Sequence, residues 1–171
     1  MLRNDRPARF YLPPEARQDV ERLHALAQRT PPGSEARRLV TVTMNALLGI
    51  KNGARGTHPL TYMPSYPDLS DCETTYVGAD PVNRPSHRVV WRETLPEAPR
   101  GTPLREVVAI GERANGAAYH IAGQRLGRPI GVTLAELAAQ PEPIAGSRLP
   151  LRQRWTDLSA SSESRADVQY E

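Results

Sequence analysis

The sequence predicts an α+β fold, in which an N-terminal strand and an αα-hairpin pack on an antiparallel sheet of about four strands and a C-terminal helix closes the domain. Three observations support this prediction. Two early segments have the apolar spacing of amphipathic helices, three later segments have the patterns of strands, and one more helical segment follows them. We expect the three later strands to form an antiparallel meander, with the first strand added at an edge.

The N-terminal third is predicted to be one strand and two helices. Residues 8–12 form a short strand pattern that two prolines end, and Pro14 suits the first position of a helix. Ser34 is a suitable N-cap for the second helix, which Asn52 and Gly53 should end. The apolar positions with helical spacing are Ala16, Val20, Leu23 and Ala27 in the first helix and Leu39, Val42, Met44, Leu47, Leu48 and Ile50 in the second.

Three segments in the middle of the chain are predicted to be strands. The first covers residues 71–77 and follows a loop, residues 54–70, that is rich in proline and tyrosine. The second covers residues 87–92, and the third, residues 105–110, contains the apolar run Val107–Ile110, which is typical of a central strand covered on both faces. The alternation of the second strand places Arg88, Val90 and Arg92 on one face and His87, Val89 and Trp91 on the other.

Helical spacing returns after the last strand. Asn115 is a suitable N-cap for a helix that Gly127 should end, and Thr133 is a suitable cap for a short helix over residues 132–140. We therefore predict one domain over residues 9–127 and a C-terminal extension over residues 128–171. The extension should be partly disordered, because most of it is rich in proline, serine and charge.

The composition limits the classes of protein. The chain has 171 residues, a net charge of +3 and a single cysteine, so an internal disulfide is excluded and a polyanionic partner is compatible with its charge. No apolar run approaches the length of a membrane span, and the N-terminal residues lack the apolar core of a signal peptide. We expect a cytoplasmic protein without a membrane partner.

Two arginines and a tyrosine are predicted to meet at one place in this fold. Arg113 leaves the end of a central strand just before a helix N-terminus, where backbone N–H groups favour an anion. Arg88 lies on the neighbouring strand, and Tyr119 lies on the following helix. Planar guanidinium groups hold two oxygens of a phosphate at once, so the sequence predicts a phosphate-binding site.

These residues form two motifs that together resemble the RelE branch of the RelE/ParE superfamily of toxins from toxin-antitoxin systems. The resemblance covers residues 9–127 in layout. The motifs that carry it are His-Arg-Val-Val-Trp-Arg at 87–92, the apolar strand Val107–Ile110 followed by Gly111-Glu112-Arg113, and Tyr119 followed by Ala122, Arg125 and Leu126.

The resemblance implies a ribosome-dependent endoribonuclease that cleaves mRNA by attack of a ribose 2′-hydroxyl on the adjacent phosphate. It implies no metal or other cofactor, and it implies a ribosome, an mRNA and a small cognate antitoxin protein as partners. Arg88, Arg113 and Tyr119 map onto the phosphate-binding and catalytic positions of the family. By the same resemblance we expect Arg92, Arg125, Arg17 and Arg37 to contact RNA.

The chain departs from this family at the general base. Family members place lysines on the strand before the first arginine, whereas residues 72–77 contain none, and Lys51 is the only lysine of the chain. We expect His120 to be the catalytic replacement, since His87 should point to the opposite face from Arg88. Glu73 and Tyr76 on the neighbouring strand are further candidates.

Simpler interpretations of the same residues stay open. Arg88 and Arg113 could be ordinary strand arginines paired with Glu93 or Glu112, and Tyr119 could only pack its helix on the sheet. The hairpin arginines could lie on a solvated helix face. At the level of function, the alternatives are a ParE-like toxin that inhibits a topoisomerase without catalysis and an inactive binding protein with a RelE-like fold.

Overall fold

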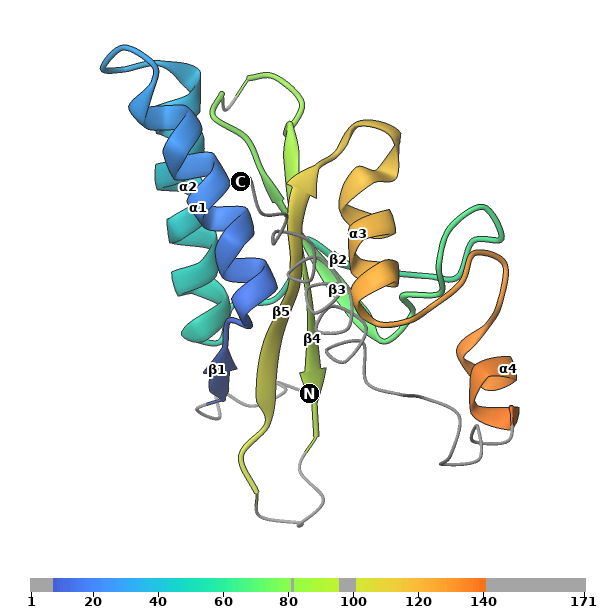
Figure 1. Cartoon of the computed structure of the whole chain (residues 1–171). Coiled ribbons are helices and arrows are strands. Elements are labelled where there is room, and N and C mark those ends of the chain that lie inside the picture. The colour runs from blue at the N-terminus through green and yellow to red at the C-terminus, as the bar shows by residue number, and fades with distance from the viewer. Residues whose placement is uncertain (1–7, 81, 96–100, 141–171) are drawn as a thin grey trace, which may run out of the picture. The chain divides into compact units, whose positions relative to one another are not determined.

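The structure is a computed structural model that describes residues 8–80, 82–95 and 101–140. One sheet with strand order β1-β5-β4-β3-β2 forms its centre (Figure 1). The elements in chain order are β1 (Arg9–Tyr11), α1 (Pro14–Gln28), α2 (Glu35–Lys51), β2 (His58–Pro59), β3 (Cys72–Val77), β4 (His87–Thr94), β5 (Leu104–Glu112), a 3₁₀ turn (Ala114–Gly116), α3 (Ala117–Arg125) and α4 (Leu134–Ala139).

The predicted α+β class is confirmed, but the predicted antiparallel sheet of about four strands needs correction. The sheet has five strands and is mixed, because β1 pairs with β5 in the parallel direction. The fifth strand, β2, lies in the segment that was expected to be a loop and pairs with β3. Two residues that include a proline are too short to show the period-2 pattern of a strand. The meander of β3, β4 and β5 and the edge position of β1 are confirmed.

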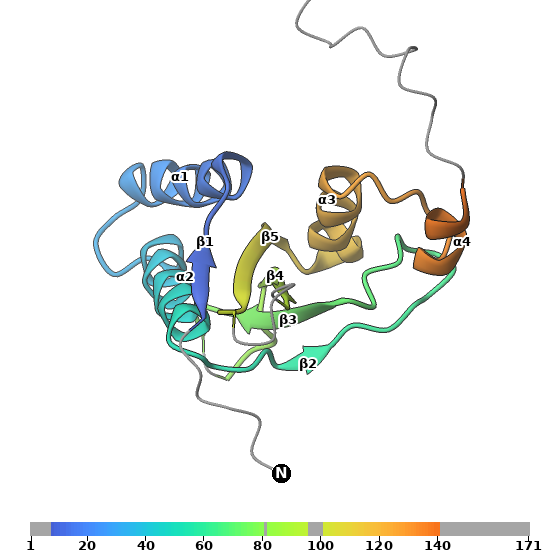
Figure 2. The same ribbon diagram turned by 90° about the horizontal axis from the view of Figure 1, so that it is seen from below.

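Helices cover both faces of the sheet. Helices α1 and α2 lie on one face and α3 lies on the other (Figures 1 and 2). The core is therefore divided into two clusters. The hairpin cluster contains Ala16, Leu47, Ile50, Val77, Val89, Trp91, Val107 and Ile110. The α3 cluster contains Leu60, Leu69, Cys72, Val90, Val108, Ala109, Ala118, Tyr119 and Ala122.

A β-bulge in β5 lets one apolar run serve both clusters. Val90 pairs with Ala109 and Trp91 pairs with Val107, so Val108 is an extra residue in β5. As a result, Val108 and Ala109 both join the α3 cluster, while the residues before and after them join the hairpin cluster. The prediction that this run forms a central strand covered on both faces is confirmed.

The predicted boundaries of the hairpin helices are also confirmed. Pro14 is the first residue of α1, and the Ser34 hydroxyl accepts a hydrogen bond of 3.4 Å from the Arg37 backbone N–H at the start of α2. Asn52 is the C-cap of α2, and Gly53 follows with φ +98°. These signals are local, so they could be recognised without the tertiary structure.

Asp19 of α1 holds the outer edge of β5. Strand β1 pairs with β5 only as far as Glu106, so the rest of this edge needs other partners. The Asp19 carboxylate accepts a 2.9 Å hydrogen bond from the Ile110 N–H and two bonds, of 2.6 and 2.8 Å, from the Arg125 guanidinium of α3. The same guanidinium donates to the Val108 carbonyl at 2.9 Å. One ion pair thus joins α1, α3 and β5.

The segment after α3 is also tied to the loop before β3. Arg128 donates to both carboxylate oxygens of Asp71 at 2.5 and 2.7 Å, and the Leu134 N–H donates to the Asp68 carboxylate at 2.8 Å. Thr133 caps α4 as predicted, since its hydroxyl accepts a 3.1 Å bond from the Glu136 N–H.

The contacts divide the chain into one unit, Met1–Leu137, and a second, Ala138–Glu171. The predicted disorder beyond residue 140 lies outside the described residues. Among the helices that the structure describes, none has the length and apolar character needed to cross a membrane.

Replacement of Asp19 tests whether its buried carboxylate stabilises the outer edge of β5. We expect Asp19→Ala to lower the free energy of unfolding by about 3 kcal/mol, because the Arg125 guanidinium and the Ile110 N–H then lose their partner in a buried position. Urea denaturation followed by circular dichroism measures the change. Arg22→Ala is the control, since the Arg22 side chain pairs with the same carboxylate but is 64% exposed. Equal losses in the two variants would contradict the assignment.

Candidate functional site

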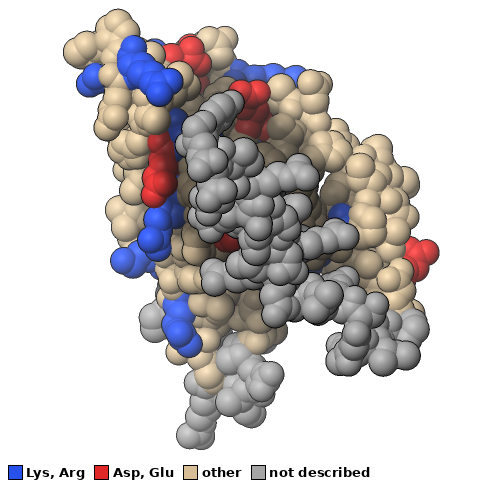
Figure 3. Space-filling model, in the orientation of Figure 1, with Lys and Arg blue, Asp and Glu red and all other residues tan. Residues whose placement is uncertain are grey.

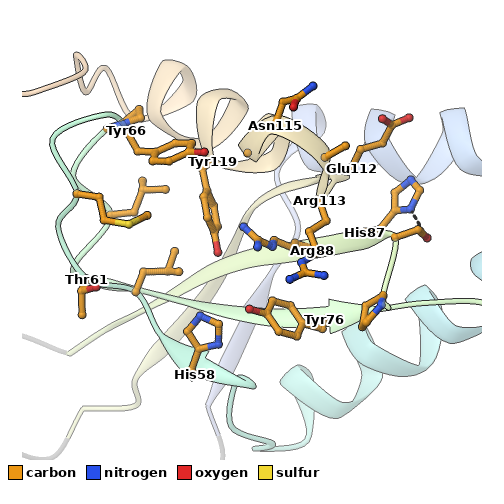
Figure 4. Close-up of a pocket in the computed structure, with 18 of the residues that line it drawn as sticks. His58, Thr61, Tyr66, Tyr76, His87, Arg88, Glu112, Arg113, Asn115 and Tyr119 are labelled. Atoms are coloured by element: carbon orange, nitrogen blue, oxygen red, sulfur yellow. Dashed lines mark hydrogen bonds between the residues drawn. The ribbon is translucent and has the colours of Figure 1, made fainter. Parts of the chain in front are cut away.

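A pocket of about 830 Å³ opens on the α3 face of the sheet (Figure 4). Its walls come from β2 and the loop after it, from β3 and β4, from the turn before β4, and from the 3₁₀ turn and α3. Figure 4 shows Thr61 and Tyr66 at one end and Arg113, Glu112 and His87 toward the other. The pocket therefore joins segments that are far apart in the sequence.

Arg88 and Arg113 meet over one tyrosine ring in this pocket. The Cζ atom of Arg88 lies 5.3 Å from the centroid of the Tyr76 ring, and that of Arg113 lies 5.4 Å from it. The face of a tyrosine attracts a cation, so a single ring offsets part of the repulsion between the two positive charges. The predicted convergence of these two arginines is what the structure shows.

These guanidinium groups differ from those of Arg92 in β4 and Arg105 in β5, which are paired with carboxylates. In the described part of the chain, neither Arg88 nor Arg113 lies within ion-pair distance of a carboxylate. Glu93, which the sequence offered as a partner, pairs with Arg105 at 2.9 Å. The ion pairs join Arg22 and Arg125 to Asp19, Arg92 to Glu106, Arg105 to Glu93, and Arg128 to Asp71. The two pocket arginines therefore remain available to an anion.

Tyr119 lies against Arg88 at the base of the pocket. The Arg88 Cζ atom is 4.3 Å from the centroid of the Tyr119 ring, whose residue is only 6% exposed. Burial raises the pKa of Tyr119, and the positive charge of Arg88 offsets only part of that rise. The phenol is therefore protonated at neutral pH and can donate a hydrogen bond. Arg88 also has a buried Nε–H without a partner among the described residues.

The start of α3 fixes the apolar end of the pocket. The prediction that Asn115 is the N-cap was wrong, because Asn115 lies inside the 3₁₀ turn with φ +52° and Gly116 is the N-cap with φ +65°. A Cβ atom on Gly116 would lie 2.2 Å from the Tyr66 ring. Tyr66 thus packs directly on this turn, and its ring meets the Tyr119 ring edge-on at 5.9 Å. Leu60, Met63 and Leu69 complete this end.

His58 is a pocket residue that the sequence reasoning missed. It lies in β2, within the segment expected to be a loop, and its ring meets the Tyr76 ring edge-on at a centroid distance of 5.2 Å. No sequence signal marked it, because a single histidine between Thr57 and Pro59 carries no pattern. Its place became visible only when β2 paired with β3.

The histidine expected to be catalytic lies elsewhere. His120 is exposed, is not among the residues that line the pocket, and packs on the Tyr66 ring at 5.2 Å. The helix turns its side chain away because Tyr119, one position earlier, faces the sheet. Of the other candidates for the base, Tyr76 lines the pocket, and Glu73 accepts a 2.7 Å bond from the Gly56 N–H.

His87 lies at the opposite rim of the pocket from Tyr66. Its Nδ1 is 2.9 Å from the Ser86 hydroxyl, and its strand position pairs with Glu112. Burial lowers the pKa of His87, although the charges of Glu112 and Glu35 oppose that shift. A neutral imidazole is therefore the favoured form at this rim.

The four arginines predicted to contact RNA do not join the pocket. Arg92 binds Glu106 at 2.8 Å, and Arg125 holds the β5 edge. Arg37 donates to the Ala27 and Thr30 carbonyls at 3.2 and 3.1 Å, which links α2 to the end of α1, and Arg17 is exposed on α1. Acidic and basic side chains lie close together over the hairpin (Figure 3). This mixture favours a solvated face over a continuous basic stripe.

Cys72 has no place in the chemistry of the pocket. It is 1% exposed in the α3 cluster, and burial, together with the Asp71 charge, raises the pKa of its thiol to about 12. In the described part of the chain, no three histidine, cysteine, aspartate or glutamate side chains are grouped so that they could hold a metal ion.

No protein-family model, curated protein or solved structure matches the chain. The function has to be argued from the chemistry of the pocket.

The contact between Gly116 and Tyr66 can be tested with a matched pair of glycines. Gly116 and Gly127 have the same φ of +65°, but a Cβ atom on Gly127 would meet nothing within 4 Å. We expect Gly127→Ala to cost about 1 kcal/mol from backbone strain alone. Gly116→Ala should cost clearly more, and the added replacement Tyr66→Ala should remove the excess. Urea denaturation of the variants gives the values, and identical losses would argue against a tight contact.

The thiol provides a test that needs no substitution. We expect Cys72 in the native protein to react with iodoacetamide at pH 8 far more slowly than a free thiol, because both access and thiolate formation are suppressed. Mass spectrometry after timed quenching measures the labelled fraction, and the protein in 8 M urea serves as the positive control. Rapid labelling of protein that keeps its native circular dichroism spectrum would show that the α3 cluster opens.

Proposed function

We propose that the chain is an endoribonuclease that binds an RNA phosphate between Arg88 and Arg113 and cleaves by attack of the adjacent 2′-hydroxyl. The observation that carries this proposal is the pair of guanidinium groups over the Tyr76 ring, which have no carboxylate partner among the described residues. Two positive charges held near each other in a pocket favour a bound anion. Their planar forks match the oxygens of a phosphate.

The rest of the pocket suits a nucleotide better than a free phosphate. Its volume of about 830 Å³ is within the range of small-molecule sites. The end formed by Leu60, Met63 and Tyr66 is apolar and aromatic, and nucleobases stack on such surfaces. A ribose between the two ends then brings its 2′-hydroxyl beside the bound phosphate.

The reaction follows from these positions. The 2′-oxygen attacks phosphorus, the bond from phosphorus to the 5′-oxygen breaks, and a 2′,3′-cyclic phosphate and a 5′-hydroxyl are formed. Arg88 and Arg113 stabilise the negative charge that gathers on the phosphate oxygens. Tyr119 keeps Arg88 in place through its ring, and its protonated hydroxyl can donate to a phosphate oxygen or to the leaving oxygen.

More specifically, we propose that the chain is a RelE-like toxin that acts on mRNA in the ribosome and is neutralised by an antitoxin protein. Its support is the resemblance of residues 87–92 and 107–126, whose residues Arg88, Arg113 and Tyr119 line one pocket. A ParE-like inhibitor of topoisomerase has no need of two unpaired arginines with a protonated tyrosine.

Substitution of the two arginines tests the proposal. We expect Arg88→Ala/Arg113→Ala to lower RNA cleavage at least about 100-fold, because the charge that develops on the phosphate loses its stabilising donors. The charge-matched control is Arg9→Ala/Arg29→Ala, since both of these arginines are exposed and lie outside the pocket. Induced expression in a bacterium, with growth curves and mapping of new mRNA 5′ ends, measures the effect in cells. Purified ribosomes programmed with a labelled mRNA measure it in solution.

Each outcome has a definite meaning. Growth arrest with cuts in translated messages, lost in the double variant but kept in the control, supports the nuclease. Growth arrest with DNA damage and no new mRNA ends would replace it with topoisomerase inhibition. Normal growth and intact mRNA with the wild-type protein would leave an inactive binding protein.

A further inference from the structure

We infer that His58 of β2 accepts the proton of the attacking 2′-hydroxyl. This inference rests on the proposed function and names the group that the reaction lacks. The only lysine of the sequence, Lys51, does not line the pocket, so the base has to come from another residue type. Histidine is the side chain most suited to accept a proton near neutral pH.

The geometry brings His58 to the same ring as the phosphate-binding arginines. The Tyr76 ring has the Cζ atoms of Arg88 and Arg113 at 5.3 and 5.4 Å from its centroid and the His58 ring at 5.2 Å, at an angle of 74°. Figure 4 shows His58 beside Tyr76, on the opposite side of the pocket from Tyr119. A phosphate over Tyr76 therefore has the imidazole on one side and the phenol of Tyr119 on the other.

Pairing with β3 holds His58 in this place. His58 is opposite Thr74 in the ladder, and the flanking bonds run from Thr57 N–H to the Thr74 carbonyl at 2.7 Å and from Leu60 N–H to the Cys72 carbonyl at 2.9 Å. The Thr57 hydroxyl accepts a further 3.0 Å bond from the Tyr76 N–H. The imidazole is thus carried by a fixed strand, as a residue in catalysis requires.

The other candidates for the base are engaged or distant. The Glu73 carboxylate accepts the Gly56 N–H, and His87 has its Nδ1 at the Ser86 hydroxyl on the far rim. His120 does not line the pocket, and Glu112 is exposed beside His87. Among the described pocket residues, His58 is the imidazole without a hydrogen-bond partner.

The charged groups around His58 belong to the phosphate site. Arg88 and Arg113 face it across the Tyr76 ring. The remaining titratable groups of the lining are Tyr66, Tyr76, Tyr119, Arg84, His87 and Glu112, and Glu73 lies opposite Pro59 on β3.

The proton balance of the reaction is then complete. A ring nitrogen of His58 takes the 2′-hydroxyl proton while the 2′-oxygen forms its bond to phosphorus. The bond from phosphorus to the 5′-oxygen breaks, and this oxygen receives a proton from Tyr119 or water. Loss of the His58 proton to solvent and return of a proton to Tyr119 restore the enzyme.

Single-turnover cleavage on programmed ribosomes, measured from pH 5 to 9, tests this role. We expect the wild-type rate to rise with pH and then level off, because the base has to be unprotonated. His58→Gln should lower the rate about 100-fold and remove the rising limb, while binding of an uncleavable RNA with a 2′-deoxy nucleotide at the cut stays within twofold. Added imidazole should restore part of the rate of His58→Ala, which a purely structural role would not allow.

The controls separate this inference from the proposed function. His24→Gln replaces an exposed histidine of α1 and should keep the wild-type rate and profile. If the arginine double variant is inactive while His58→Gln keeps the wild-type rate and its pH limb, the nuclease stands and the role of His58 is overturned. If His58→Gln loses RNA binding as much as cleavage, His58 is a binding residue instead. If the wild-type protein cuts no RNA, the proposed function itself fails.

Discussion

The ion pair between Asp19 and Arg125 is the interaction on which the arrangement of the site depends. A strand edge has backbone groups that need partners, and the outer edge of β5 receives them from α1 and α3 beyond the last pairing with β1. The pair is at the end of α3, and the start of the same helix carries Tyr119 into the pocket. The pair therefore ties the end of α3 to α1 and β5, while Ala118, Tyr119 and Ala122 pack the same helix on the sheet.

The pocket itself is organised by tyrosines instead of carboxylates. Elsewhere on the sheet, Arg92 is paired with the carboxylate of Glu106, and Arg105 is paired with that of Glu93. Arg88 lies over the Tyr76 and Tyr119 rings and Arg113 lies over the Tyr76 ring, and such rings attract cations but do not neutralise them. Such an arrangement keeps positive charge available to the anionic ligand that we propose.

In the reaction that we propose, the general base lies on β2. Strand β3 presents Tyr76, whose ring lies beside both guanidinium groups, and the imidazole of His58 comes from the short strand next to β3. From this position the proposed base would approach the phosphate from the side opposite to α3. General acid–base catalysis depends on reach and proton affinity and not on position in the chain, so a strand of two residues can carry the base.

The sequence by itself determined where several helices and strands begin and end, and it indicated that Arg88 and Arg113 lie near each other. Proline and serine at the starts of α1 and α2, Gly127 after α3, and the apolar run of β5 act through neighbouring residues, so their effects could be predicted. Only the tertiary structure decided which polar residues face the pocket. Strand β2 is too short for a pattern, and its pairing with β3 brings in His58. Arg125 and Asp19 are 106 positions apart in the sequence. The sequence near either residue therefore does not indicate that they pair, or that Arg125 lies outside the pocket. Contacts between distant segments have no periodicity in the sequence, and they decide the site.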